Sequence, residues 1–382
     1  MNQFFQTWSA TWRRVLTDPG AALLLVVAPL LYSLFYPLPY LYEVVRQVPV
    51  AVVDLDQSSL SRQLIRYANA HELLRVTRRL DSVAEAEEAV KAGDVRGYLV
   101  VPVKFRADAL RGRGATVAYG GDATYFLQFK QVLTGFAEAT GTLNAAVKAR
   151  QALAAGQSRA QARLAAAPVT LVAHPVGNTR EGYKSYLIPG VFLLILQQTL
   201  VFGVGLMRGT ARAAGAPAGP APLGAFLGAG AALLTLYAGH AAFHVGLAAW
   251  IYDLPTHGQL GALALFLTPF LVACVLFAFA LSGLCPRRES SIHLFLVLSI
   301  PFLFLAGTSW PFEAMPAVLR VAGALLPSTA GIQGALRLNS LAAGWGDTIV
   351  WWGLLWVQAA LFFWPARRAW IDAPPPVLPE IS

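Results

Sequence analysis

Charge is scarce in this sequence. Only 13% of the 382 residues are Asp, Glu, Lys or Arg, whereas 56% are hydrophobic. A soluble globular domain usually has about 25% charged residues, so this composition excludes an ordinary soluble protein as the main body of the chain. We therefore expect most of the chain to be surrounded by lipid.

Lysine and cysteine are also rare, with five lysines and two cysteines. No lysine follows a glycine, so the chain has no GxxxxGK[ST] loop to hold the phosphates of ATP. It contains no GxSxG or HExxH motif and no CxxC pair. We therefore predict that the chain is not an enzyme and binds no metal or cofactor of its own. Any ATP and Mg²⁺ would be bound by a partner protein.

The basic residues fall into two populations. Nineteen of the 29 lie between Glu43 and Lys184 together with 13 of the 20 acids, which is typical of a water-facing domain. The other ten are all arginines, and eight of them form four pairs beside apolar runs: Arg13/Arg14, Arg208/Arg212, Arg287/Arg288 and Arg367/Arg368. Such pairs are typical of the cytoplasmic ends of membrane spans. They do not form the single basic face that nucleic acid requires, so no nucleic-acid partner is expected.

Six apolar stretches are long enough to cross a bilayer core, which takes about 20 helical residues. They are 21–40, 186–207, 223–251, 261–284, 291–310 and 346–365. If both termini are cytoplasmic, all four arginine pairs fall on the cytoplasmic side, and the loop 253–260, which has no Lys or Arg, falls outside. The sequence thus predicts an α-helical polytopic membrane protein with six transmembrane helices and an inserted external domain.

The first 18 residues predict an amphipathic helix at the inner membrane surface, because Phe4, Phe5, Trp8, Trp12 and Val15 recur at helical spacing. No small-x-small cleavage site follows the first apolar stretch, so 19–42 is expected to be an uncleaved transmembrane helix. Positive-inside anchoring explains the first arginine pair more simply than a twin-arginine export signal.

Residues 43–184 alternate short β-rich runs with helical patterns, which predicts a mixed α/β domain. The expected strands lie near 48–55, 75–79, 98–102, 116–120 and 169–176, and the expected helices near 58–70, 82–92 and 104–111. From Tyr125 to about Ala166 the chain is rich in Ala, Gln and Leu without proline, which predicts one long helix or a helical hairpin.

Three further segments belong to the remaining membrane region 185–366 and its end. Residues 208–222 are rich in Gly, Pro and Ala and predict a cytoplasmic loop, and 367–382 predict a cytoplasmic tail. Residues 311–345 are apolar but broken by prolines and glycines, a pattern that suits re-entrant helices lining a cavity better than a lipid-facing span. The small residues Gly224, Gly228 and Ala232 predict a close helix contact within or between subunits.

Four polar residues inside the spans are candidates for a substrate pathway. His240 and His244 are four residues apart and so share one helix face, at a depth where polar groups are costly. They could contact a substrate or a proton, bind a metal, or hydrogen-bond to a neighbouring helix, and the last is favoured. Gln197 and Gln198 could likewise contact a substrate or hydrogen-bond to a neighbouring helix, and the second role is again favoured. No Asp or Glu lies centrally in a span, which argues against an ion-coupled carrier.

Five segments resemble the ABC type-2 exporter permeases, most closely the bacterial drug-exporter-like branch with one large periplasmic domain between the first two spans. They are VPVAVVDLDQSSLSRQLIR from Val48, AEAEEAVKAGDVRGYLVVPVKF from Ala84, RGRGATVAYGGDATYF from Arg111, NTREGYKSYLIPGVFLLILQQTL from Asn178, and GTSWPFEAMPAVLRVAGALLPSTAGIQG from Gly307. Their order and spacing match that family over nearly the whole chain.

The resemblance implies a location in a bacterial inner membrane and two permease subunits, identical or sister, docked on two cytoplasmic ABC ATPases. It places the ATPase contacts on the N-terminal segment and the first cytoplasmic loop, which here contribute Trp8, Trp12, Arg13, Arg14, Arg208 and Arg212. A path would open outward between the second and fifth spans, and a periplasmic adaptor is a further partner to consider.

Few charges lie inside the spans, which favours an amphipathic or lipid-like cargo over a polyanion. The function expected from sequence is therefore ATP-driven export of an amphipathic small molecule or lipid-like substrate. The alternative is a non-transporting receptor or envelope scaffold that uses the external domain to bind a partner.

Overall fold

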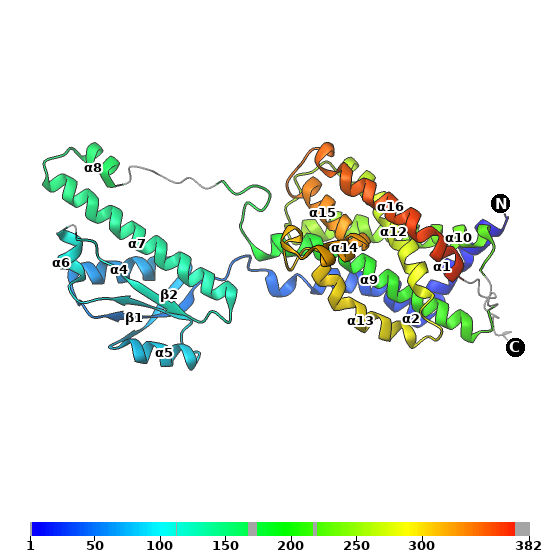
Figure 1. Cartoon of the computed structure of the whole chain (residues 1–382), viewed down its shortest axis with the longest axis horizontal. Coiled ribbons are helices and arrows are strands. Elements are labelled where there is room, and N and C mark those ends of the chain that lie inside the picture. The colour runs from blue at the N-terminus through cyan, green and yellow to red at the C-terminus, as the bar shows by residue number, and fades with distance from the viewer. Residues whose placement is uncertain (1, 112, 167–173, 217–219, 371–382) are drawn as a thin grey trace. The chain divides into compact units, whose positions relative to one another are not determined.

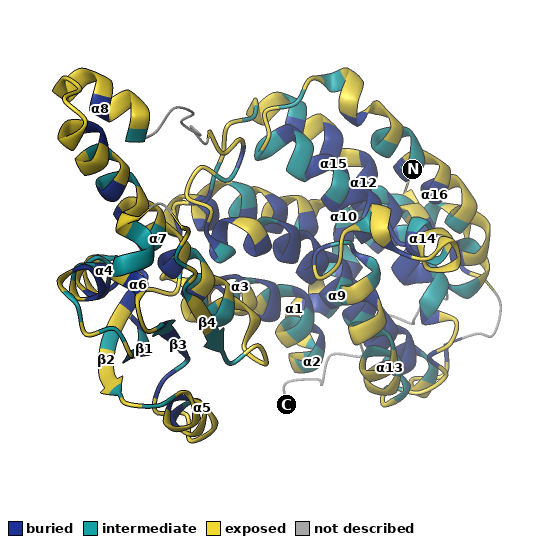
Figure 2. Ribbon diagram, turned by 60° about the vertical axis from the view of Figure 1, so that its left-hand side comes forward, coloured by how far each residue is buried: buried dark blue, intermediate teal, exposed yellow. Residues whose placement is uncertain are grey.

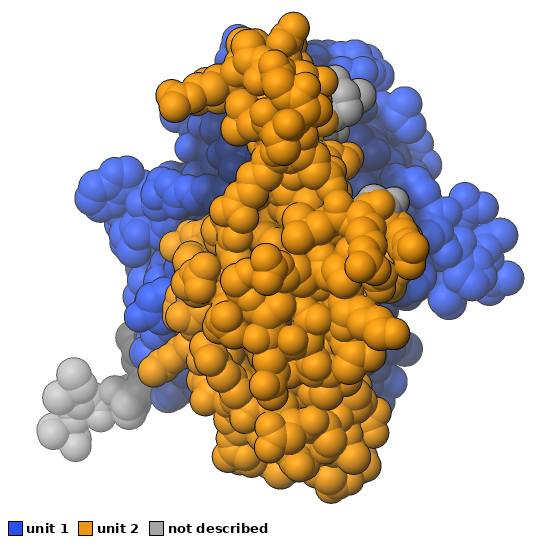
Figure 3. All heavy atoms as spheres, turned by 90° about the vertical axis from the view of Figure 1, so that its left-hand side faces the viewer, with its two compact units in different colours: residues 1–43, 174–382 blue, residues 44–173 orange. Residues whose placement is uncertain are grey.

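The computed structural model describes residues 2–111, 113–166, 174–216 and 220–370. The chain forms two compact units (Figure 1; Figure 3). Unit 1 comprises Met1–Glu43 and His174–Ser382, and unit 2 comprises Val44–Ala173. Unit 2 is therefore an insertion in the sequence of unit 1, and each unit is described by itself.

Five helical stretches among the described residues are long and apolar enough to cross a membrane. They are Pro19–Tyr40, which comprises α2 (Pro19–Ala22), η1 (Leu23–Val27), α3 (Ala28–Phe35) and η2 (Leu38–Tyr40); α9 (Tyr183–Ala213); Leu223–Ile251, which comprises α10 (Leu223–Ala242), η3 (Phe243–Ala248) and α11 (Ala249–Ile251); α12 (Leu260–Ser282); and α16 (Trp345–Ala369). The helix α1 (Asn2–Thr17) precedes them. This confirms the predicted helical membrane fold with an α/β domain inserted after the first span.

The fifth predicted span is shorter than expected. Its helix, α13 (Ser290–Leu305), has 16 residues and is about 24 Å long, which is less than the thickness of a bilayer core. The helix ends near Gly307, whose φ of 81° is left-handed and stops an α-helix. The predicted span 291–310 therefore loses its last turn.

Two short helices follow α13 before the last span begins. α14 (Ala317–Ala324) comes after the turn η4 (Phe312–Ala314), and α15 (Pro327–Asn339) packs against α9, α12 and α16. A Cβ added at Gly331 or Gly334 would lie 2.5 or 2.1 Å from the rings of Phe270 and Phe266. These glycines let α15 lie directly against α12. The burial of α15 supports the prediction of re-entrant helices here, which stays a prediction.

The core of unit 1 is formed mainly by α9 and α12, and Figure 2 shows buried residues along both. α9 is buried along most of its length, whereas α16 keeps much of its surface exposed. α9 also continues to Ala213, so the expected loop 208–222 begins in the structure as helix. Residues 217–219 of that loop and 371–382 of the expected tail lie outside the described residues.

A proline inside a span removes a backbone donor, and the structure shows how one such gap is filled. Pro269 in α12 has no N–H for the carbonyl of Leu265, four residues earlier. Trp352 on α16 donates its indole N–H to that oxygen at 3.3 Å. A side chain from a neighbouring helix thus replaces the missing backbone hydrogen bond.

Unit 2 is built on a four-stranded sheet with strand order β2-β1-β3-β4. β1 is parallel to β2 and β3, and β4 is antiparallel to β3. The strands are β1 (Val48–Asp54), β2 (Leu74–Leu80), β3 (Gly97–Val101) and β4 (Ala118–Gly121), and the helices are α4 (Ser59–Ala70), α5 (Val83–Lys91), α6 (Phe105–Leu110), α7 (Phe126–Ala154) and α8 (Arg159–Ala166).

The helices of unit 2 cover both faces of the sheet. α4 and α7 pack their apolar residues with the strands into one core, and α5 packs against Ala51 on the opposite face. The segment expected as a long helix or hairpin forms α7 and α8, which pack together after a turn at Gly156, whose φ is 81°. Of the fifth expected strand, 169–176, residues 169–173 lie outside the described residues, and 174–176 are not in a strand.

Candidate functional site

The four arginine pairs lie at one end of the bundle in unit 1. Arg288 makes a bidentate ion pair with Asp18, with both N···O distances at 2.8 Å, and also donates to Thr210. Arg208 donates to the carbonyl oxygens of Cys285 at 2.9 Å and Ala369 at 2.8 Å. These bonds join the end of α1, the end of α9, the loop after α12 and the end of α16 (Figure 1).

The ion pair at this end changes the acidity of both partners. The hydrogen bond from Arg288 is the main cause that lowers the pKa of the Asp18 carboxyl, and the same hydrogen bond raises the pKa of Arg288. Asp18 also caps α2, because its carboxylate accepts hydrogen bonds from the N–H groups of Gly20 and Ala21. One carboxylate thus starts the first span and joins it to the loop after α12.

The predicted ATPase contacts differ in how far they are exposed. Arg208 is only 7% exposed, and its guanidinium is used inside the bundle. Arg13 is exposed, while Trp8, Trp12, Arg14 and Arg212 are partly exposed. The buried position of Arg208 could not be read from its sequence, because its acceptors lie 77 and 161 residues away.

α1 packs along α10 through a face of small residues. Thr7, Thr11 and Val15 are the buried residues of α1. A Cβ added at Gly228 would lie 2.4 Å from the backbone oxygen of Phe4, so only glycine permits this approach. The small-residue repeat on α10 therefore makes a contact within the subunit.

His240 and His244 hydrogen-bond to the first span. His240 Nε2 lies 2.9 Å from the Leu25 carbonyl, and His244 Nε2 lies 3.2 Å from the Pro29 carbonyl. A carbonyl oxygen only accepts, so each Nε2 carries the proton and each Nδ1 of the neutral ring is an acceptor. Pro29 has no N–H that could bond to the carbonyl of Leu25, four residues earlier, and His240 donates to that carbonyl instead. The pair thus bridges two helices.

Other features of the structure bear on the two remaining hypotheses for these histidines. No group of three or more His, Cys, Asp or Glu that could hold a metal occurs within the described parts of the chain. His244 is fully buried and stacks on Phe192 with 5.0 Å between ring centroids. Its Nδ1 has no hydrogen-bond partner among the described residues.

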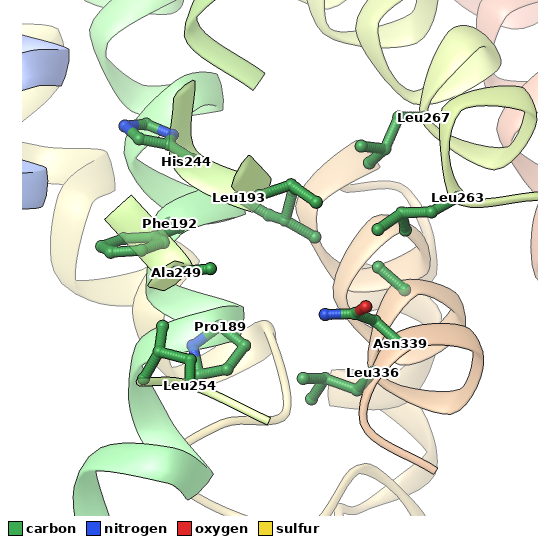
Figure 4. A pocket seen from close by; sticks show the side chains of 12 residues that line it. Pro189, Phe192, Leu193, His244, Ala249, Leu254, Leu263, Leu267, Leu336 and Asn339 are labelled. Carbon is green, nitrogen blue, oxygen red and sulfur yellow. The ribbon is translucent and has the colours of Figure 1, made fainter. Parts of the chain in front are cut away.

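His244 borders a small pocket with a volume of about 40 Å³, between α9, η3, α12 and α15. Figure 4 shows His244 and Phe192 on one side of this pocket, and Asn339 and Leu336 on the other. The walls between them are mostly apolar side chains. Asn339 lies in the broken apolar stretch, and its place in the pocket could not be inferred from the sequence.

The two adjacent glutamines point to different neighbours. Gln197 is fully buried, and its side-chain oxygen accepts from the N–H of Ser328 at 2.6 Å, at the start of α15. Gln358 on α16 donates to the carbonyl of Ala324 at 2.7 Å, at the end of α14. The side-chain amides of Gln197 on α9 and Gln358 on α16 therefore both bond to the turn between α14 and α15. Sequence reasoning missed Gln358, although a lone amide in a span was a usable signal.

Gln198 faces a second pocket, between α3, α9 and α13. Its amide donates to the Ser299 carbonyl at 3.2 Å. This pocket has a volume of about 270 Å³. It is lined by Tyr32, Tyr36, Val191, Leu194, Ile195, Gln198, Thr199, Phe295, Ser299, Ile300 and Leu303. The four predicted pathway residues therefore lie in three different surroundings. The two histidines lie against the first span, Gln197 lies at the start of α15, and Gln198 lies at the second pocket.

These features define a multi-pass helical membrane protein with one arginine-rich bundle end, an inserted α/β domain and no ATP-binding loop in its sequence. A family model described as ABC-2 family transporter protein matches residues 21–366, and the chain belongs to this family. It is the membrane component of an ABC-2 type transporter, a class that lacks the ATPase and pairs with separate ABC ATPase subunits. The chain matches none of the curated proteins.

Proposed function

We propose that this chain is the permease subunit of an ATP-driven exporter that moves an amphipathic small molecule or lipid-like substrate outward across a bacterial inner membrane. The observation that carries the proposal is the pocket between α3, α9 and α13. Its walls are largely apolar, and Gln198, Thr199 and Ser299 place polar groups among them. Such a lining suits a molecule with an apolar body and a few hydrogen-bonding groups.

The exposed face of α13 supports a permease pair, as a homodimer or with a sister permease. Leu296, Val297, Ile300 and Phe304 are each more than half exposed on this helix. A second subunit that packs on this face would close the pocket from the side. The path between the second and fifth spans would then be shared by both subunits and would open when the ATPases rock them.

The arginine-rich end supports cytoplasmic termini and an ATPase at that end. Cations collect on the cytoplasmic side of membrane proteins, and all four pairs lie together here. In the proposed complex, Trp8, Trp12, Arg13, Arg14 and Arg212 contact the ATPase. Arg208 positions the ends of α9, α12 and α16 behind that surface.

Of the predicted pathway residues, Gln198 is the one we place in contact with substrate. His244 borders the smaller pocket and offers an unpaired Nδ1 acceptor to a donor group that enters there. His240 and Gln197 bond to backbone groups of neighbouring segments, which supports a role in holding the bundle.

Two tryptophan variants test the route. Ile300→Trp adds bulk at the wall of the α3–α9–α13 pocket, and Val350→Trp adds the same bulk at an exposed position of α16 outside it. We expect Ile300→Trp to abolish the stimulation of ATP hydrolysis by amphipathic dyes and their efflux from cells, measured with the partner ABC ATPase. Val350→Trp should retain both activities.

Equal activity of the two variants would contradict the pocket as the route. If no ATPase gene lies beside this one, and no ATPase hydrolyses ATP in a permease-dependent way, the export proposal fails. That result would favour the receptor or scaffold alternative.

A further inference from the structure

Unit 2 contains a groove of its own, between α4, α6, the loop after α6 and α7. Its volume is about 430 Å³, which lies within the range for small-molecule sites, roughly 300–1,000 Å³. The floor is apolar and buried, with Leu60, Phe105, Leu143 and Val147. The polar residues along it come from one helix, α7: Thr140, Asn144, Lys148 and Gln151.

Two glycines lie inside α7, and one of them, Gly141, lines the groove. A glycine inside a helix costs about 1 kcal/mol relative to alanine, so each needs a physical reason. Gly135 has one, because a Cβ there would lie 2.5 Å from the side chain of Leu74. Gly141 lines the groove, and a Cβ there would meet nothing within 4 Å. Packing within unit 2 therefore does not explain the glycine at position 141. A ligand in the groove would explain it, because a side chain at this position would take up space that the ligand needs.

The surroundings of the groove are basic. α6, the loop after it and the adjoining part of α7 carry five exposed cations and one partly exposed acid, Asp108. The cations are Arg106, Arg111, Arg113, Lys148 and Arg150. None of the five forms an ion pair with a described residue, and Lys148 lines the groove itself. The field over the groove therefore favours a negatively charged ligand.

We propose that this groove binds a single-chain anionic amphiphile with a carboxylate headgroup. Its alkyl chain lies on Leu60, Phe105 and Leu143, and its carboxylate pairs with Lys148. The apolar floor accounts for the chain, and the unpaired cations account for the headgroup. The site lies within unit 2 and does not depend on the export route proposed above.

Photolabelling of the full chain in lipid nanodiscs tests the site. The probe is a 12-carbon fatty acid with a diazirine on its chain, and the comparison probe is the 12-carbon alcohol with the same diazirine. After illumination and digestion, we expect the fatty acid adducts in unit 2 to map to peptides that contain 105–115 and 140–151. Adducts confined to the membrane spans would overturn the proposal.

Gly141→Leu places a side chain in the groove at a position where a Cβ meets nothing within 4 Å, and leucine is a better helix former than glycine. We expect this variant to unfold at the same or a higher temperature. Labelling of the groove should nevertheless fall about tenfold, which corresponds to a loss of about 1.4 kcal/mol in binding free energy. Undiminished labelling in this variant would also overturn the proposal.

The charge is tested with a matched pair of lysines on the same helix. Lys148→Gln should lower labelling by the fatty acid about fivefold, as expected for one partly screened charge contact, and leave labelling by the alcohol unchanged. Lys130, exposed on α7 and outside the groove, provides the control, and Lys130→Gln should change neither. An equal loss for both probes in Lys148→Gln, or the same loss in Lys130→Gln, would refute the anionic headgroup.

Discussion

The two units satisfy their backbone groups in different ways. In unit 2, β1 bonds to β2 and to β3 along the sheet, and partly exposed serines such as Ser58 and Ser82 cap α4 and α5. In unit 1, polar side chains deep in the helices bond to backbone groups of other segments, as His240 does to Leu25 and Gln197 does to Ser328. These capping side chains fix local structure in unit 2, whereas these buried side chains join distant segments in unit 1.

The difference follows from the solvent. Water can replace a lost hydrogen bond at the surface of unit 2, but no water is available to a carbonyl in the hydrocarbon core. The carbonyls that lose a backbone donor to prolines inside the spans therefore need donors from neighbouring helices. We expect polar substitutions in the bundle to cost more stability than equivalent substitutions in unit 2, and three sets of variants test this from the largest effect to the smallest.

The largest effect is expected for His240→Leu. The variant leaves the Leu25 carbonyl without its donor, which should lower the free energy of unfolding by about 2 kcal/mol. Pro29→Ala restores a backbone N–H one turn after Leu25. In that background, the loss from His240→Leu should fall below about 0.5 kcal/mol, since the carbonyl has a new partner. Reversible unfolding in mixed detergent and SDS micelles measures all four proteins.

Additive losses in this cycle would show that the histidine and the proline are not coupled. They would also remove the argument that His240 compensates for Pro29. The comparison between the two units would then rest on the glutamines, His244 and Trp352.

The next effect is expected at the bundle end, where lipid meets water. Asp18→Ala removes both the cap of α2 and the pair with Arg288, and we expect a loss of about 1–2 kcal/mol. Asp18→Asn keeps a capping side chain and loses the charge, so its loss should be smaller. Thermal unfolding of the purified chain in detergent measures both variants.

The pH dependence gives an independent check on the same carboxylate. Its pKa is lowered in the folded chain, so its contribution is fully present above the unfolded-state pKa, about 3.9, and is lost as the pH falls through the folded-state value. The unfolding temperature of the parent chain should fall below about pH 4. In Asp18→Asn, the unfolding temperature should fall less steeply with decreasing pH, because the contribution of Asp18 is gone. The same dependence of unfolding temperature on pH in both proteins would contradict the pairing of Asp18 with Arg288.

The spans and strands could be read from the sequence because each depends on a local pattern. Apolar runs of sufficient length mark the spans, and the four strands of unit 2 lie within a few residues of the β-rich runs. The early end of α13 also had a local signal in Gly307, which was overlooked. Local pattern is thus enough for the elements of this fold.

The contacts of the candidate site could not be read in this way. The two histidines find their acceptors 215 residues away, and Gln197 finds Ser328 131 residues away. A single sequence shows that a polar group in a span needs a partner, but it does not show which partner. Arg208 illustrates the result, because its place in the first cytoplasmic loop predicted an ATPase contact, whereas in the structure it donates to carbonyls inside the bundle.

The smallest effect is expected in unit 2, for Ser82→Ala. Ser82 caps α5 by accepting a hydrogen bond from the N–H of Glu85 at 3.2 Å, and this hydrogen bond is exposed to solvent. Water can bond to that N–H in the variant, so the loss should be about 1 kcal/mol or less. It should appear as local hydrogen exchange in α5, with the unfolding of unit 1 unchanged. A loss as large as that of His240→Leu would break the contrast, because a solvated cap and a buried bridge would then be worth the same.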